Sequence, residues 1–176
     1  MNQALGFRAS LTDAGLVGLY DYWMALRQSL GRLPRRSEID PLDLPAEVLP
    51  GMIIIERDAD LRFWCRLAGT RMREIYGFEV TGKYLDDVMP AGAVTFRKGI
   101  YQTVLDGRCA LFCRLRFSVP GREFVASDRL YVPVLNDDTD EATVLVGAQR
   151  YLMSSEIVGT PDSDGIYSLV VDDTPA

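Results

Sequence analysis

Large apolar residues recur at alternating intervals of three and four positions over residues 12–30, which is the spacing of a helix with one apolar face. The stripe consists of Leu16, Leu19, Trp23, Leu26 and Leu30. Thr12 or Asp13 can cap the start of this helix, and Gly31 can end it. A face of this size has to be covered by the protein's own sheet, by a second copy of the chain, or by both. The five stripe residues are therefore candidate dimer-interface residues.

Runs of β-branched and alternating apolar residues predict five strands, two before and three after a helical region. The predicted strands are residues 52–57, 61–68, 109–118, 123–135 and 143–151. Between them, residues 70–76 and 93–105 have the spacing and end signals of helices. Strands grouped at both ends with helices between them predict an α+β fold. We expect a five-stranded antiparallel sheet with short helices on one face and the N-terminal amphipathic helix on the other.

Composition divides the chain into three parts. We expect residues 1–34 to be a capping or dimerisation helix, residues 35–152 to be the α+β domain, and residues 153–176 to be an acidic, partly disordered tail. The tail contains five acidic residues and no Lys or Arg, so the net charge of −6 leaves about −1 for the rest of the chain. The apolar run at residues 166–171 can add a strand to its own sheet or to a partner's, or it can remain disordered.

Several kinds of chemistry are excluded by what the sequence lacks. Histidine is absent from all 176 residues, which excludes Ser-His-Asp and Cys-His catalysis, a histidine-held haem and histidine metal sites. The glycine-rich phosphate-binding loops are also absent. The nearly neutral main part lacks the basic face that is typical of nucleic-acid binders. We therefore expect no enzyme activity, no metal and no nucleic-acid partner.

The three cysteines, Cys65, Cys109 and Cys113, lie within apolar strand-like runs and have no paired spacing. This pattern predicts reduced core thiols in a cytoplasmic protein. The sequence has no apolar run of about 18 residues, so we expect no membrane insertion. Its beginning also lacks the basic and apolar pattern of a secretion signal.

Short motifs follow one another along the chain at defined spacings. They are Tyr22-Trp23-x-x-Leu26-Arg27, Pro34-x-Arg36-x-x-Ile39-Asp40-Pro41, Leu49-Pro50, Phe63-x-x-Arg66-Leu67-x-Gly69-Thr70, Gly77-x-x-x-Thr81-Gly82 and Leu130-Tyr131-x-Pro133-Val134. In their order and spacing they resemble a family of stand-alone PAS domains of alphaproteobacteria, once catalogued as a domain of unknown function. The resemblance covers residues 20–152 and departs from the pattern at Cys65 and in the acidic tail.

This resemblance implies a PAS fold and a role in signalling. Flavin-binding PAS domains have a reactive cysteine in a short helical motif similar to Asn-Cys-Arg-Phe, and this chain has no such motif. Flavin is therefore not expected, and the lack of histidine argues against haem. An unidentified small organic ligand is the cofactor that is compatible with these features.

Six residues are candidates for ligand binding. They are Arg66, Thr70, Arg73, Tyr76, Phe96 and Tyr101. Arg66 stands in an otherwise apolar strand, so it either forms an ion pair, with Glu56 or Asp128, or anchors a carboxylate or phosphate of a ligand. The resemblance implies that residues 70–76 form part of a pocket wall. The aromatic residues of the second helix can close that pocket or simply fill the core.

Two functions agree with these features. The first is a single-domain sensor that binds a small ligand and signals through a partner protein in trans. The second is a ligand-free adaptor that forms a homodimer through its first helix and docks on a signalling protein such as a kinase. The volume of the interior distinguishes them, because ligand sites usually enclose about 300 Å³ or more.

Overall fold

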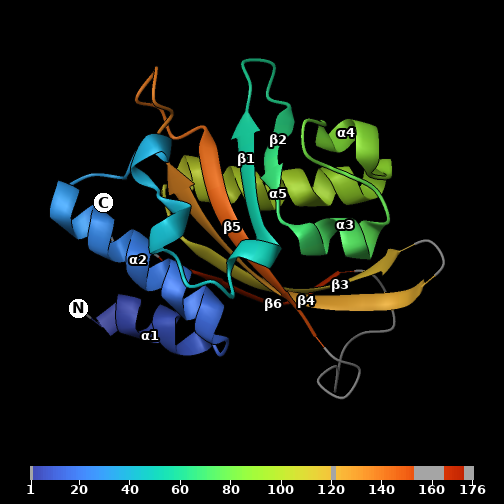
Figure 1. The fold of residues 1–176 in the computed structure, drawn as a ribbon, viewed down its shortest axis with the longest axis horizontal. Helices are drawn as coiled ribbons and strands as arrows, with labels where there is room; N and C mark the ends of the chain where they lie inside the picture. Colours follow the sequence, from blue (N-terminus) through green and yellow to red (C-terminus); the bar gives the residue numbers. More distant parts are fainter. Residues whose placement is uncertain (1, 120–121, 153–164, 173–176) are drawn as a thin grey trace.

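The helices and strands follow the order that the apolar pattern predicts, with one addition at each end of the chain. The computed structural model describes residues 2–119, 122–152 and 165–172 (Figure 1). Its α-helices are α1 Asn2–Ser10, α2 Ala14–Leu30, α3 Thr70–Tyr76, α4 Leu85–Val88 and α5 Ala91–Gly107. Its strands are β1 Met52–Arg57, β2 Phe63–Ala68, β3 Leu111–Val119, β4 Arg122–Val134, β5 Val144–Tyr151 and β6 Gly165–Val171. Three short 3-10 helices, η1 Arg36–Glu38, η2 Pro41–Asp43 and η3 Leu49–Gly51, precede β1.

The strands form one antiparallel sheet in the order β2-β1-β5-β4-β3-β6. The expected five-stranded sheet therefore has a sixth strand, because the apolar run of the tail pairs with β3 of its own chain. Leu111 lies opposite Val171, and this pairing satisfies backbone groups of β3 that would otherwise form an open edge. Partial disorder is predicted for the tail, and its residues 153–164 and 173–176 lie outside the described residues.

Both faces of the sheet are covered (Figure 1). Helices α1 and α2 pack on one face, and α3, α4 and α5 pack on the other. Strand β1 contributes to both layers, since Ile54 belongs to the core beneath α2 and Ile55 to the core beneath α5. The fold is thus α+β in three layers, as the strand and helix pattern predicts.

Helix α2 begins and ends where its capping residues predict. Asp13 accepts hydrogen bonds from the backbone N–H groups of Gly15 and Leu16, at 3.0 and 3.1 Å, and Gly31 closes the helix with a φ of +64°. The apolar stripe of α2 packs on the protein's own sheet. Trp23 is fully buried, and its indole N–H donates to the backbone oxygen of Pro133 at 2.9 Å.

This packing corrects the proposed dimer seam. Leu16, Leu19 and Trp23 are each at most 2% exposed within a single chain, so they cannot contact a second copy without unfolding the layer. Leu26 is half-buried against the same core, and Leu30 is the one stripe residue on the surface, at 36% exposure. The 3-4 spacing indicates an apolar face but does not identify what covers it, and here the sheet does.

Helix α1 has no counterpart in the pattern analysis, because its few apolar residues form no long stripe. Phe7 anchors it, since this ring is buried and lies 5.0 Å from the ring of Tyr20 between centroids. Arg8 and Asp21 add an exposed ion pair at 2.7 Å. The N-terminal layer is therefore an α1–α2 pair rather than a single helix.

A buried hydrogen bond joins this layer to the end of the sixth strand. The Tyr20 hydroxyl donates to a carboxylate oxygen of Asp172 at 2.7 Å, and both residues are buried. Burial, together with this hydrogen bond, raises the pKa of Tyr20 far above its usual value, so the hydroxyl keeps its proton and remains a donor at neutral pH. The contact ties α2 to the chain just after β6.

We expect Tyr20→Phe to loosen β6 selectively. Loss of a hydrogen bond to a buried carboxylate should lower the free energy of unfolding by about 1.5–3 kcal/mol. Hydrogen exchange should accelerate at the β3–β6 amides more than at the β1–β5 amides. Tyr22→Phe is the matched control, because the Tyr22 hydroxyl makes exposed or partly buried bonds to backbone groups of Asp40 and Glu38. Equal exchange in β6 of both variants would contradict the proposed anchor.

Candidate functional site

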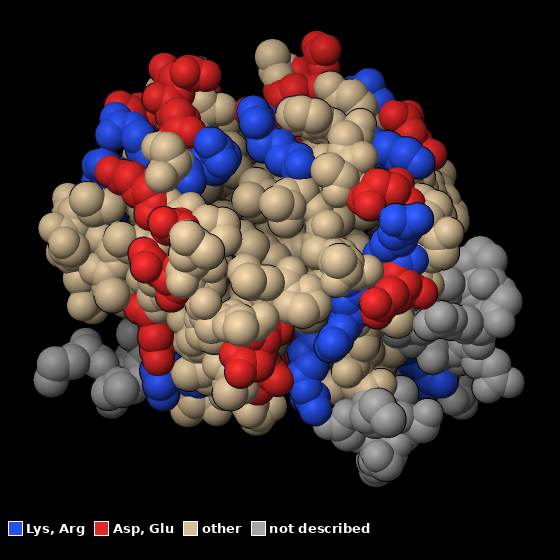
Figure 2. Space-filling view, viewed as in Figure 1, with Lys and Arg blue, Asp and Glu red and all other residues tan. Residues whose placement is uncertain are grey.

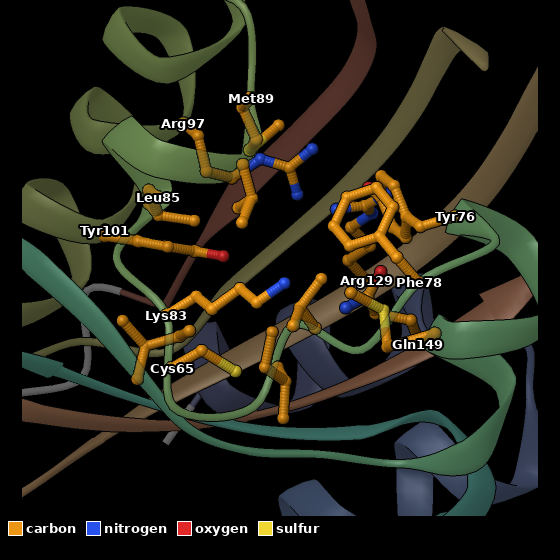
Figure 3. Close-up of a pocket in the computed structure, with 15 residues that line it drawn as sticks. Cys65, Tyr76, Phe78, Lys83, Leu85, Met89, Arg97, Tyr101, Arg129 and Gln149 are labelled. Atoms are coloured by element: carbon orange, nitrogen blue, oxygen red, sulfur yellow. The ribbon is translucent and has the colours of Figure 1, made fainter. Parts of the chain in front are cut away.

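A small cavity lies between the sheet and the layer of α3, α4 and α5 (Figure 3). Its volume is about 30 Å³, which is room for roughly one water molecule. Apolar walls come from β1, β2, α3 and the segment that leads into α4, for example Ile55, Met72, Val80 and Leu85. Polar groups reach it from α5, β4 and β5, so side chains far apart in sequence meet at one point.

Arg97 is the most unusual residue of this cavity. Helix α5 places it there because Val94, Arg97, Tyr101 and Val104 follow one another at intervals of three and four and so share one face. That face packs on the sheet, and Arg97 is only 4% exposed. A guanidinium is charged at any ordinary pH, and Arg is almost never fully buried unless it is paired.

Arg97 has no charge partner among the described residues. One terminal nitrogen of its guanidinium donates to the Tyr131 hydroxyl at 3.2 Å, whereas its Nε atom is buried and has no hydrogen-bond acceptor there. The nearby Cys113 thiol and Tyr131 hydroxyl keep their protons, because burial raises the pKa of Cys113 to about 12 and the pKa of Tyr131 well above its usual value. Both of these side chains are therefore neutral at pH 7 and supply no counter-charge to Arg97.

Aromatic side chains contact one another beside Arg97. The Tyr101 ring is fully buried and contacts both Phe63 and Tyr131 edge-on, at centroid distances of 5.4 and 5.2 Å. Figure 3 shows the Tyr101 hydroxyl pointing into the cavity. On the α3 side, the Tyr151 hydroxyl lies 3.2 Å from the sulfur of Met72 and 3.4 Å from the side-chain oxygen of Gln149.

A second cation stands at the mouth. The backbone of Lys83 is tied to β2, because its carbonyl accepts from the Cys65 N–H at 2.9 Å. Its side chain crosses the Phe78 ring, with the ammonium 5.3 Å from the ring centroid, and points into the cavity (Figure 3). Within the described ranges no carboxylate forms an ion pair with Lys83.

Two further polar side chains complete the lining. Arg129 projects from β4, and its Nε donates to the Ser127 hydroxyl at 2.8 Å. Gln149 projects from β5, and its buried side-chain nitrogen has no hydrogen-bond partner in the part of the chain that the structure describes. Buried polar groups in native proteins normally have partners. Arg97 and Gln149 therefore each present an unused buried donor at this cavity.

Cysteine chemistry is not favoured here. Cys65 lines the cavity, but burial raises its pKa to about 12, so its thiol is protonated and weakly nucleophilic at neutral pH. Cys113 is equally buried, and the three cysteines are free thiols. Over the described ranges there is no cluster of three or more acidic, Cys or His side chains that could hold a metal ion.

The six predicted ligand-binding residues divide into two groups. Tyr76 and Tyr101 line the cavity. Thr70, Arg73 and Phe96 lie on outward surfaces of their helices, and Phe96 is 39% exposed. Each of the two helices, α3 and α5, thus contributes one of the predicted side chains to the cavity.

Arg66 lies on the outer surface of β2 and is a correction to its proposed ligand role. It forms an ion pair with Glu56, one of its two predicted partners. Its guanidinium lies 5.2 Å from the Trp64 ring. The neighbouring strand β1 supplies Glu56 opposite Trp64, which brings the carboxylate within reach. Arg66 is thus solvent-facing and paired, and the unpaired interior arginine is Arg97.

The charged side chains of the molecular surface are of mixed sign on the face drawn in Figure 2. On the face drawn in Figure 2, acidic and basic side chains lie next to one another around the rim, and uncharged residues fill the middle. That face has no extended basic patch. In the described ranges, no helix combines the length and the apolar character needed to cross a membrane.

A model of the PAS domain matches residues 12–149. Similar solved structures include the LOV domain of the blue-light photoreceptor Aureochrome1, with 12% identity, 62% of this chain and 86% of that chain covered, and a TM-score of 0.44. A fungal LOV domain photoreceptor has 12% identity and a TM-score of 0.46, with 75% of this chain and 92% of that chain covered. The Rhodobacter sphaeroides LOV protein has 17% identity and a TM-score of 0.44, with 60% of each chain covered. No curated protein matches significantly. Because the match to the PAS domain model spans most of the sequence, this chain belongs to the PAS domain family.

Proposed function

We propose that this protein is a sensory module that binds a small organic ligand in the cavity beneath α5 and passes the signal to a partner protein. PAS domains are typically sensory units rather than enzymes. The observation that supports ligand binding is Arg97, a buried guanidinium with no counter-charge among the described residues. The expectation of an interior ligand site is retained, and its anchor moves from Arg66 to Arg97.

The energetics of burial support this role. An ion that leaves water without a partner costs several kcal/mol even after the protein relaxes. Position 97 lies on the apolar face of a helix, where a long apolar side chain would pack without that penalty. A ligand with acceptor atoms would recover part of the energy by meeting the unused N–H groups. Functional sites commonly keep such locally destabilising residues.

Ligand binding requires the cavity to expand, because about 30 Å³ is far less than the roughly 300 Å³ of an ordinary ligand site. The wall between α3 and α4 is suited to such a movement. Gly77 and Gly82 flank residues 78–81, and both have left-handed backbones, with φ of +79° and +78°. Phe78, between them, lines the cavity and is 37% exposed. Rotation at the two glycines would open the cavity.

The small cavity also favours a second candidate, a ligand-free adaptor that forms a homodimer and docks on a signalling protein. In that case Leu30, the exposed end of the α2 stripe, is the available contact of the predicted seam. Light scattering would then show a dimer, and Leu30→Asp would convert it to a monomer. A wild-type protein that is monomeric in this measurement would remove the support for the adaptor.

Native mass spectrometry tests the sensor. We expect the gently purified wild-type protein to carry a small molecule that is lost on denaturation. Arg97→Met should lack this added mass, because the ligand's acceptor atoms lose their donor. Arg66→Met is the matched control, since it removes an arginine that is already paired with Glu56 at the surface. An added mass that is absent from all three proteins, combined with no ligand-induced stabilisation of the wild type, would overturn the sensor proposal.

A further inference from the structure

We infer that the ligand of this cavity is a small organic carboxylate, held by Arg97 and Lys83. The inference rests on the proposed function and specifies its chemistry. Among the 15 lining residues, the charged side chains are Lys83, Arg97 and Arg129, and none of the 15 is acidic. In a protein whose formal net charge is −6, a cavity whose charged lining residues are all cations favours an anion.

The two cations approach from different elements. Arg97 comes from α5 and Lys83 from the segment beside β2, and Figure 3 shows both side chains directed into the cavity. A carboxylate has two oxygens, which a planar guanidinium can meet with parallel N–H groups and an ammonium can meet from the side. The unused Nε–H of Arg97 is one such donor. The Tyr101 hydroxyl also points inward, and it would have to exchange its hydrogen bond with the Tyr131 hydroxyl for one with the ligand.

The rest of the lining limits what the anion can be attached to. Apart from its few polar groups, the wall is made of aliphatic, sulfur-containing and aromatic side chains such as Met72, Tyr76, Phe78 and Met89. Methionine side chains adapt their shape easily, so they can accommodate an apolar body as the wall opens. An acid with one carboxylate and a short aromatic or aliphatic body fits this division of the cavity into a charged end and an apolar end.

A phosphate fits less well. A phosphate ester has three terminal oxygens and a charge near −2, and sites for it typically present several backbone N–H groups. Here the described donors are a few side chains separated by apolar surface. A neutral ligand would leave Arg97 without a counter-charge and would not relieve the cost of its burial. The carboxylate therefore agrees best with both the charge and the walls.

Thermal unfolding with matched probe molecules tests the inference. The acids are phenylacetate and hexanoate, their neutral counterparts are phenylacetamide and hexanamide, and the phosphates are phenyl phosphate and inorganic phosphate. We expect at least one acid to raise Tm by about 5 °C or more at a concentration about 100-fold above its Kd. The corresponding amide should bind about 10- to 100-fold more weakly, because it lacks the charge that Arg97 meets.

Variants separate the roles of the two cations. Arg97→Met should abolish the Tm increase caused by the acid, and Lys83→Met should weaken binding of the acid about 3- to 10-fold, as expected for a more exposed charge. Arg66→Met should bind the acid as the wild type does. Lys83 lies at the mouth, so its variant keeps the inference testable even if position 97 affects folding.

The outcomes distinguish the ligand class from the function. Stabilisation by an amide equal to that by its acid, or by a phosphate and by no acid, would overturn the carboxylate while leaving a ligand-binding sensor. A Tm unchanged by every acid would also overturn the carboxylate. If native mass spectrometry then found no bound molecule either, the sensor proposal would fall with it.

Discussion

Replacing Arg97 with methionine should raise the free energy of unfolding of the ligand-free protein by about 1–3 kcal/mol. The substitution removes a buried charge that has no counter-charge among the described residues, and it keeps a long side chain with good helix propensity on the buried face of α5. The lost hydrogen bond to Tyr131 reduces the gain by about 1 kcal/mol. For a chain of this length, Tm should rise by about 2–4 °C for each kcal/mol.

Urea unfolding of protein that has been refolded, so that any bound molecule is removed, measures this effect. Arg66→Met is the control, since the exposed ion pair with Glu56 should change the free energy of unfolding by no more than about 1 kcal/mol. A variant that gains stability and loses ligand binding would show that Arg97 is kept for function at the expense of stability. If Arg97→Met instead unfolded at a clearly lower urea concentration, Arg97 would be structural and the sensor proposal would lose its support.

Trp23→Ala should lower the free energy of unfolding by about 3–5 kcal/mol without changing the oligomeric state of the protein that remains folded. Trp23 is fully buried on the face of α2 that packs on the sheet. Its indole N–H donates to the Pro133 carbonyl, which would be left without this donor. A loss of this size is a large part of the 5–15 kcal/mol that stabilises a typical domain.

Leu30→Ala is the matched control on the same helix. At 36% exposure, its effect on the free energy of unfolding should stay within about 0.5 kcal/mol. Urea unfolding gives the stabilities of both variants, and light scattering compares the oligomeric state of the Trp23 variant with that of the wild type. A Trp23 variant that unfolded like the wild type but dissociated from a dimer would instead place this residue in an interface between copies, contrary to its burial against the sheet.

Most of the secondary structure follows from the sequence because the local signals agree with one another. The β-branched run 52–57 is β1 without any change of bounds, and the capping residues place α2 to within two residues. The predicted strands after α5 shift by one or two residues at their starts. These elements carry their own signals in turn residues, caps and periodicity, so tertiary contacts did not have to override them.

The sixth strand is different, since its sequence supports two outcomes. A short apolar run between acidic residues can pair with an edge or stay unpaired, and only the position of β3 decides this. The edge of β3 lies within reach of the tail, and β6 pairs with it. Asp172, just after β6, accepts a hydrogen bond from the buried Tyr20 hydroxyl. Neither of these features is visible along the chain.

The sequence predicts only part of the cavity lining. Tyr76 and Tyr101 were predicted and line the cavity, whereas Arg97 was not considered. The signal was present, because Arg97 lies on the helical face of Val94, Tyr101 and Val104. Arginine at such a position usually extends to solvent, so the pattern by itself favours a surface residue.

For Arg129 on β4, the alternation of residues along the strand does not indicate that the side chain lines the cavity. Strand β4 is buried on both faces, so the alternation of Arg129 and Leu130 does not tell which of them faces the cavity. The register decides it, because Arg129 lies opposite Cys113 and therefore shares the face of the α5 layer, away from Arg114. Lys83 likewise reaches the cavity only because its backbone is tied to β2.

The sequence by itself determined the fold class, the order of the elements and the lack of histidine chemistry, because these depend on local patterns and on composition. The tertiary structure decided what the α2 stripe covers, where the tail strand pairs, and which charges meet inside the molecule. These depend on contacts between residues far apart in the chain, such as Trp23 with Pro133 and Arg97 with Tyr131. The sequence alone cannot identify a charged residue on an apolar face, such as Arg97, as a candidate ligand anchor. The structure identifies it, because it shows that the side chain is buried and that no carboxylate among the described residues pairs with it.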